Sequence, residues 1–79
     1  MNAPSLTLGS WLREARIRSG FNQADTARVL NVSRPLVSRW EKGRSTPDII
    51  QFAALVTLYE ADWLYEIVRQ RHPSTMHAA

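Results

Sequence analysis

The chain has 79 residues, a net charge of +3 and no cysteine. This length predicts one domain with one core, and the absence of cysteine excludes disulfides and thiolate metal clusters. No apolar run approaches the roughly 20 residues that a membrane span needs, and the first ten residues lack the charged and apolar regions of a secretory signal. We therefore expect a soluble cytoplasmic protein with no membrane segment.

Charge is distributed unevenly along the chain. Residues 1–46 carry eight basic and three acidic side chains, a net +5, whereas residues 47–79 carry two basic and four acidic ones, a net −2. Such an asymmetry favours a basic face that meets a polyanion. A solvated surface with uneven charge has the same composition, so charge alone does not decide.

The first expected helix covers residues 8–19. Apolar or small residues recur there at helical spacing: Leu8, Trp11, Leu12, Ala15 and Ser19. Thr7 is expected to cap its N-terminus, and Gly20 to end it in a left-handed conformation. Residues 1–6 show no periodicity and are expected to form a flexible lead-in.

Two short helices joined by a tight turn are expected next. Asn22 and Asp25 form a capping box at the start of the first, and Asn31 tolerates the left-handed backbone that ends it. Ser33 is expected to cap the second, and Gly43 to stop it.

Two more helices complete an expected all-α domain over residues 7–71. Pro47 is expected to be the first residue of the fourth helix, whose buried stripe is Ile49, Phe52, Ala53, Val56 and either Tyr59 or Glu60. Asp62 is the expected N-cap of the fifth, which runs from Trp63 to about Arg71. Residues 72–79 are expected to be a disordered tail.

The middle of the chain has the pattern of a helix-turn-helix. Two helices of about eight residues flank a turn of three or four, and the second helix is polar and basic. By spacing alone such a hairpin is also a common packing unit. The identities of the residues are more specific than their spacing. Residues 8–67 resemble the lambda-repressor-like family, also called the Xre or Cro type, in the segments LGSWLREAR, NQADTARVL, NVSRPLVSRWEKG and ADWL.

The resemblance implies a five-helix domain that binds double-stranded DNA, and it implies roles for particular residues. The positions that match the family's base-reading residues are Ser33, Arg34, Pro35 and Arg39. Those that match its DNA-backbone contacts are Asn22, Gln23, Ser38, Lys42 and Arg44. The resemblance also implies that Gln23 braces the recognition helix. Arg16 and Glu41 match a structural ion pair that fixes the recognition helix against the first helix.

The chain departs from the family pattern at a few positions. Thr26 stands where the family usually has Leu, which predicts a looser or polar contact between the second and fourth helices. Glu60 stands where Gly is common, so the family pattern does not decide the conformation of the turn between the fourth and fifth helices. Pro35 and Leu36 replace residues that are usually polar.

Each proposed contact has a simpler alternative. The arginine fork meets O6 and N7 of guanine together, but Arg34 and Arg39 could instead contact phosphate. Pro35 and Leu36 could meet thymine methyl groups or could start and pack the helix. The three tryptophans could stack on bases, but their helical spacing favours the core.

The last expected helix is apolar on nearly every side, which is typical of an interface. Its expected homodimer contacts are Trp63, Leu64, Ile67 and Val68. Two copies could then read the two half-sites of a palindrome. The sequence thus predicts a dimeric DNA-binding regulator, most simply a repressor of the phage Cro or restriction-controller kind. The alternative is an antitoxin or anti-regulator that binds another protein through this helix.

Catalysis has no support in the sequence. There is no serine–histidine–acid set, glycine-rich phosphate loop or cluster of metal-ligand residues, and both histidines, His72 and His77, lie in the expected tail. We therefore expect no enzyme activity, no metal and no cofactor.

Overall fold

The computed structural model describes residues 7–71 and places five helices there. They are α1 (Leu8–Ser19), α2 (Gln23–Leu30), α3 (Arg34–Glu41), α4 (Ile49–Tyr59) and α5 (Trp63–Arg71). No strand occurs within this range, which confirms the all-α fold class. None of these helices is long and apolar enough to span a membrane. The expected lead-in and tail, residues 1–6 and 72–79, lie outside the described residues.

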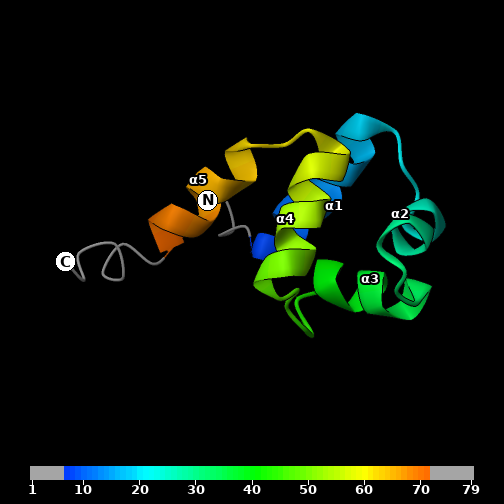
Figure 1. The fold of residues 1–79 in the computed structure, drawn as a ribbon. Coiled ribbons are helices and arrows are strands. Elements are labelled where there is room, and N and C mark those ends of the chain that lie inside the picture. The colour runs from blue at the N-terminus through cyan, green and yellow to red at the C-terminus, as the bar shows by residue number, and fades with distance from the viewer. Residues whose placement is uncertain (1–6, 72–79) are drawn as a thin grey trace, which may run out of the picture.

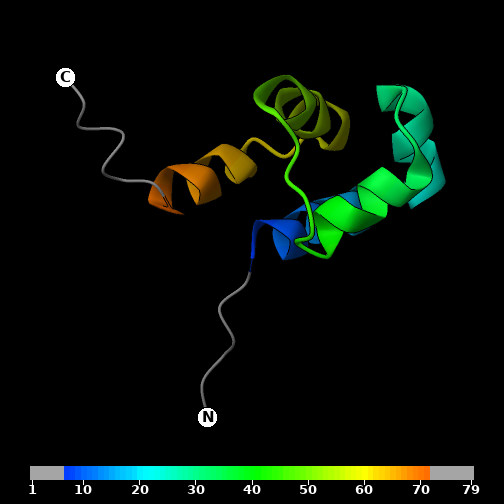
Figure 2. The ribbon, with the colours of Figure 1, turned by 90° about the horizontal axis from the view of Figure 1, so that it is seen from below.

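The helices are arranged around α1, which contacts α3, α4 and α5. In Figure 1, α2 and α3 pack together at one end, α4 stands in front of α1, and α5 extends toward the opposite end. Figure 2, seen from below, shows α4 nearly end-on beside α3. The lower side of the molecule in Figure 1 is therefore formed by α3 and the loop that follows it.

The ends of α1 and α2 are where cap chemistry predicts them. The Thr7 side chain caps α1, and Gly20 ends it at φ 84°. The Asn22 side chain accepts from the backbone N–H of Asp25 at 2.7 Å, and the Asp25 carboxylate accepts from the N–H of Asn22 at 3.4 Å. Asn31 ends α2 at φ 58°, as expected for a residue that tolerates the left-handed region.

The prediction for the start of α4 was wrong. The helix begins at Ile49 and its N-cap is Asp48, so Pro47 lies before the helix and is not its first residue. The Asp48 carboxylate accepts from the N–H of Gln51, and the Gln51 side chain accepts from the N–H of Asp48. This reciprocal pair satisfies two donors at the helix start, so it outweighs the preference of proline for the first helical position.

The expected buried stripe of α4 was wrong at its N-terminal end, and at its C-terminal end the structure decides between the two alternatives. Ile49 is 82% exposed, because the first turn of α4 projects beyond the core that begins at Phe52. Glu60 is exposed and ends α4 in the left-handed region at φ 50°, the position where glycine is common, and Tyr59 is the buried member of the pair. Leu55, which the stripe omitted, is 1% exposed.

One core joins all five helices. Its fully buried apolar members are Leu12, Ala15, Ala27, Val37, Trp40, Phe52, Leu55, Val56, Tyr59, Ala61 and Leu64. Trp11 and Trp63 pack against this core and meet edge to face, with ring centroids 5.7 Å apart. All three tryptophans are therefore in or against the core, as their helical spacing favoured.

Gly9 marks a very close approach between α1 and α3. A Cβ atom added at Gly9 would lie 2.4 Å from the carbonyl oxygen of Trp40 and 2.7 Å from that of Glu41. Both oxygens belong to the backbone at the end of α3, so neither can swing away as a side-chain tip could. The absence of a side chain at Gly9 thus lets the backbones of the two helices touch.

The buried hydroxyl of Thr26 makes a polar contact between α2 and α4. Thr26 Oγ1 and Tyr59 Oη are 2.8 Å apart, and neither residue is more than 5% exposed. Burial raises the pKa of Tyr59, although the bond to Thr26 acts in the opposite direction. This confirms the polar contact predicted from the threonine that replaces the usual leucine.

Replacing Gly9 with Ala is expected to destabilise the protein, although alanine is the better helix former. The gain in helix propensity is at most about 1 kcal/mol, whereas extra volume in a packed contact costs about 1–3 kcal/mol. The collision is with backbone, so we expect the cost to exceed the gain and the melting temperature of Gly9→Ala to fall, as measured by circular dichroism. An unchanged or higher melting temperature would contradict the close contact.

Replacing Thr26 with Val is expected to cost about 1–3 kcal/mol, because the shape is kept and the Tyr59 hydroxyl loses its buried partner. Tyr59→Phe leaves the threonine hydroxyl alone and should also destabilise. The double variant removes both polar groups, so its cost should be clearly below the sum of the two single costs. Urea unfolding of the four proteins measures this, and simple additivity would show that the two hydroxyls do not depend on each other.

Candidate nucleic-acid interface

The helix-turn-helix consists of α2, α3 and the turn between them. The turn is closed by the N–H of Val32, which donates to the carbonyl of Ala27 at 2.9 Å, and Val32 packs against the core. Ser33 then caps α3 by accepting from the N–H of Leu36 at 3.2 Å. The start of α3 is thereby fixed by both a buried apolar contact and a cap.

One side of α3 faces the core and the opposite side is exposed. Val37 and Trp40 are 1% and 2% exposed, whereas Arg34, Pro35 and Arg39 belong to the exposed residues. The exposed side thus combines two guanidinium groups with one apolar ring. Three of the four positions matched to base reading therefore lie on one accessible helix surface.

Two of the remaining candidates at the start of α3 have their own structural roles. Ser33 is exposed, but its hydroxyl oxygen is the helix cap. Leu36 is half-buried and packs against the core, which favours packing over contact with a thymine methyl group.

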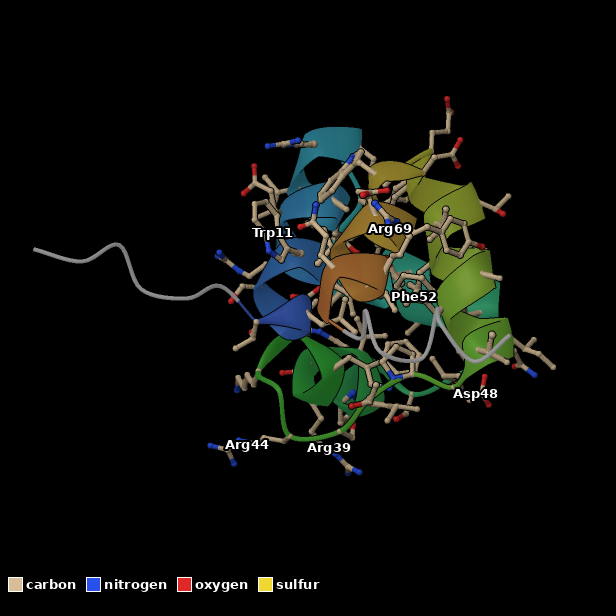
Figure 3. The ribbon with its side chains drawn as sticks, turned by 90° about the vertical axis from the view of Figure 1, so that its left-hand side faces the viewer. Trp11, Arg39, Arg44, Asp48, Phe52 and Arg69 are labelled. Carbon is tan, nitrogen blue, oxygen red and sulfur yellow. The ribbon has the colours of Figure 1, made fainter. Side chains whose placement is uncertain are left out.

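Lys42 and Arg44 extend the basic surface beyond the end of α3. Gly43 takes φ 76°, and the N–H of Arg44 donates to the carbonyl of Arg39 at 2.9 Å, so the chain turns sharply around the helix end. Both side chains are exposed. Figure 3 shows Arg39 and Arg44 on the same lower side of the molecule, pointing away from the core.

These four cations have no acidic partner in the part of the chain that the structure describes. The ion pairs found within residues 7–71 involve other arginines. Arg34, Arg39, Lys42 and Arg44 are all exposed and lie on α3 or the loop after it, whereas Arg13, the other exposed cation without a recorded pair among the side chains that the structure describes, lies on α1. A cluster of cations on one side raises the local potential and attracts a polyanion.

The residues matched to phosphate contacts at the start of α2 are engaged inside the protein. The Asn22 side chain caps α2. Gln23 Nε2 donates to Glu41 Oε1 at 3.1 Å, and Gln23 is half-buried. Ser38, another backbone candidate, is half-buried on α3. The sequence pattern indicated where these residues lie but not that Gln23 bonds to Glu41.

Glu41 forms a compact network with Arg16. Arg16 Nε donates to Glu41 Oε2 at 2.7 Å and Arg16 Nη2 donates to Glu41 Oε1 at 3.1 Å, while Arg16 Nη1 donates to the carbonyl of Phe21 at 2.9 Å. The two side chains are only 12% and 5% exposed. The hydrogen bond to Glu41 raises the pKa of Arg16 above its ordinary value, so the guanidinium stays charged. The ion pair implied by the family resemblance is present.

The structure changes the expected interface on α5. Leu64 is 0% exposed and belongs to the core of its own chain, so it cannot lie on a surface between two copies of this fold. Trp63 is half-buried against Trp11, and the Arg18 guanidinium lies 5.1 Å from its ring centroid. Ile67 and Val68 are half-buried. The apolar excess on α5 is therefore smaller than its composition indicated.

The most exposed large apolar side chains lie elsewhere, at Ile49 and Ile50 on the first turn of α4. Apolar periodicity predicted Ile49 in the core, which is wrong, and gave no expectation for Ile50. The capping box of Asp48 and Gln51 was a signal in the sequence that would have located both isoleucines in the first turn of α4, although not that this turn is exposed.

Replacing Arg16 with Met is expected to lower the free energy of unfolding by about 3–5 kcal/mol, because it leaves the Glu41 charge buried without its partner. Arg28→Met is the matched control. Arg28 pairs with Asp25 at 2.6 Å, but its side chain is 72% exposed, so the loss there should stay below about 1 kcal/mol. Urea unfolding compares the two, and equal losses would contradict a special role for Arg16.

Comparison with known proteins agrees with this geometry. A family model described as a helix-turn-helix domain matches residues 7–64, which is well over half of the chain and includes α1 to α4. No curated protein and no solved structure matches the chain. The chain therefore belongs to the helix-turn-helix domain family, consistent with its lambda-repressor-like sequence pattern.

Proposed function

We propose that this protein is a cytoplasmic, sequence-specific transcriptional regulator that binds a palindromic DNA operator as a homodimer and represses transcription. The observation that carries the proposal is the cluster of exposed cations on α3 and the loop after it: Arg34, Arg39, Lys42 and Arg44. A helix-turn-helix places this helix in the major groove, where the base edges are accessible. Repression follows if the bound dimer occupies the site that polymerase needs.

Arg39 and Arg34 supply base recognition in this proposal. A guanidinium that bonds to O6 and N7 of guanine discriminates against other bases by about 1–3 kcal/mol. Arg39 is exposed in the last turn of α3, and Arg34 is exposed in its first turn. Pro35, also in the first turn, offers an apolar contact to a thymine methyl group.

Lys42 and Arg44 supply backbone contacts, because they lie beyond the helix end and reach outward. The start of α2 adds a second phosphate contact, since backbone N–H groups at a helix N-terminus attract anions. The Gln23 carboxamide has two N–H groups, so one can bond to a phosphate while the other stays on Glu41.

The direct test is selection of bound sequences from a random pool of duplex DNA with the full chain. We expect enrichment of a two-fold symmetric site, with half-sites about one helical turn, or roughly 34 Å, apart. Equal affinity for the selected site and a scrambled duplex at physiological salt would refute sequence-specific binding.

Arg39→Ala is expected to relax base preference at one position of each half-site, because the guanidinium that distinguishes guanine is lost. The measurement is affinity for the selected site and for its single-base variants. A loss of affinity that is the same for every variant would assign Arg39 to phosphate and not to a base.

Lys42→Ala is the contrasting variant. It should weaken binding to all duplexes alike and reduce the slope of log affinity against log salt by about one, since one phosphate contact disappears. Titrations at several salt concentrations measure the slope. An unchanged slope would remove Lys42 from the backbone contacts.

A further inference from the structure

Ile49 and Ile50 form an exposed apolar surface on the first turn of α4. They are 82% and 78% exposed, more than any other large hydrophobic residue in the described range. Ala53 is half-buried and lies one helical turn further on. It is four residues after Ile49 and three after Ile50, so all three lie on the same face of α4. We call Ile49, Ile50 and Ala53 the isoleucine patch. Single exposed apolar residues are ordinary, but a contiguous apolar surface marks an interaction site.

The isoleucine patch lies at one flank of the basic surface. Figure 3 looks roughly along α3, with α1 on the left, α4 on the right, and Arg39 and Arg44 below. Asp48, the cap that directly precedes the patch, lies at the lower right. The patch is therefore beside the surface proposed to meet DNA and close to its level.

This position suits a second copy of the chain. A recognition helix in the major groove lies across the duplex, so a copy on the neighbouring half-site must approach one of the flanks of α3. A two-fold axis brings the same surface of both copies together. At the α4 flank this pairs isoleucines with isoleucines. The other flank, on α1, offers less apolar surface, because Ile17 is 48% exposed and its exposed neighbours are Arg13 and Arg18, the second of which pairs with Glu14.

Charge argues against DNA itself as the occupant of the patch. The Asp48 carboxylate is exposed immediately before Ile49. A carboxylate beside the patch repels phosphate, whereas an apolar surface from another protein molecule tolerates it at the polar rim.

The size of the patch predicts when the contact forms. A stable dimer buries about 800 Å² on each partner, which is far more than two isoleucines and an alanine provide. Two copies held on adjacent half-sites, however, experience a high effective concentration, roughly millimolar. A small contact that is too weak in free solution then adds measurably to binding.

We propose that the isoleucine patch joins two copies of this chain on neighbouring half-sites, and that this dimer forms on DNA and not in free solution. The inference rests on the proposed function. It replaces α5 with the first turn of α4 as the homodimer surface and predicts cooperative occupation of the operator.

The test uses the full chain, the selected palindrome, and the same duplex with one half-site scrambled. The wild-type chain should sediment as a monomer at micromolar concentration and occupy the palindrome cooperatively, about ten- to a hundredfold more tightly than two independent half-sites would allow. Ile49→Ser combined with Ile50→Ser should bind the single half-site like the wild type but lose the cooperativity. Ile17→Ser, at an isoleucine that is 48% exposed on α1, is the matched control and should retain it.

A second measurement does not depend on affinity. The chain contains no cysteine, so Ile50→Cys introduces a single thiol. With a mild oxidant, Ile50→Cys should form a disulfide-linked dimer on the palindrome but not on the duplex with one half-site, whereas Ile17→Cys should form none on either.

Three results would overturn the inference: unchanged cooperativity in the double variant, a stable dimer of the free chain, or a selected site without repeated half-sites. With unchanged cooperativity or a stable free dimer, binding to the palindrome persists and the proposed function survives. A selected site without repeated half-sites also refutes the palindromic dimer and leaves only sequence-specific DNA binding. If selection enriches no sequence, the proposed function fails and the inference fails with it.

Discussion

The carboxylate of Glu41 is the point on which the arrangement of the first three helices depends. It receives Arg16 from α1 and Gln23 from α2, and it is itself the last residue of α3. A carboxylate that is only 5% exposed is costly to bury unless its oxygens are satisfied. Here both oxygens have donors, and those donors are supplied only when all three helices are in place. α3 is therefore fixed by contacts at its C-terminal residue, whereas the side chains on its exposed side take no part in these contacts.

Features set by residues close in sequence were predictable, and only the start of α4 was missed although its capping box of Asp48 and Gln51 is equally local. The caps at Thr7, Asn22 and Ser33 and the left-handed ends at Gly20 and Asn31 each depend on residues within a few positions. The spacing of such residues determines whether the cap can form, so the helix end can be located from the sequence. The exposed side of α3 followed from the same reasoning, because its buried side was clear from apolar periodicity.

Features set by the extent of the core were not predictable in this way. Periodicity shows which face of α4 turns inward, but not that the core ends at Phe52 and leaves Ile49 uncovered. It also shows that Leu64 is apolar, but not that its own chain covers it completely. Both errors concern how far one element reaches past its neighbours, which depends on distant contacts. The family resemblance implied that Gln23 braces the recognition helix, but its partner Glu41 was not predicted for the same reason, since the chain separates the two residues widely.

The contact at Gly9 has a consequence for how such a protein can change its target over evolution. The first helix touches the end of α3 through main-chain atoms, which are the same whatever side chains the outer side carries. Substitutions at Arg34 or Arg39 therefore leave the docking of the helix untouched. Under the proposed function, a few surface substitutions can therefore exchange one preferred operator for another without compensating changes in the core. The close backbone contact between α1 and α3 requires glycine at position 9, but it places no requirement on the exposed side chains of α3.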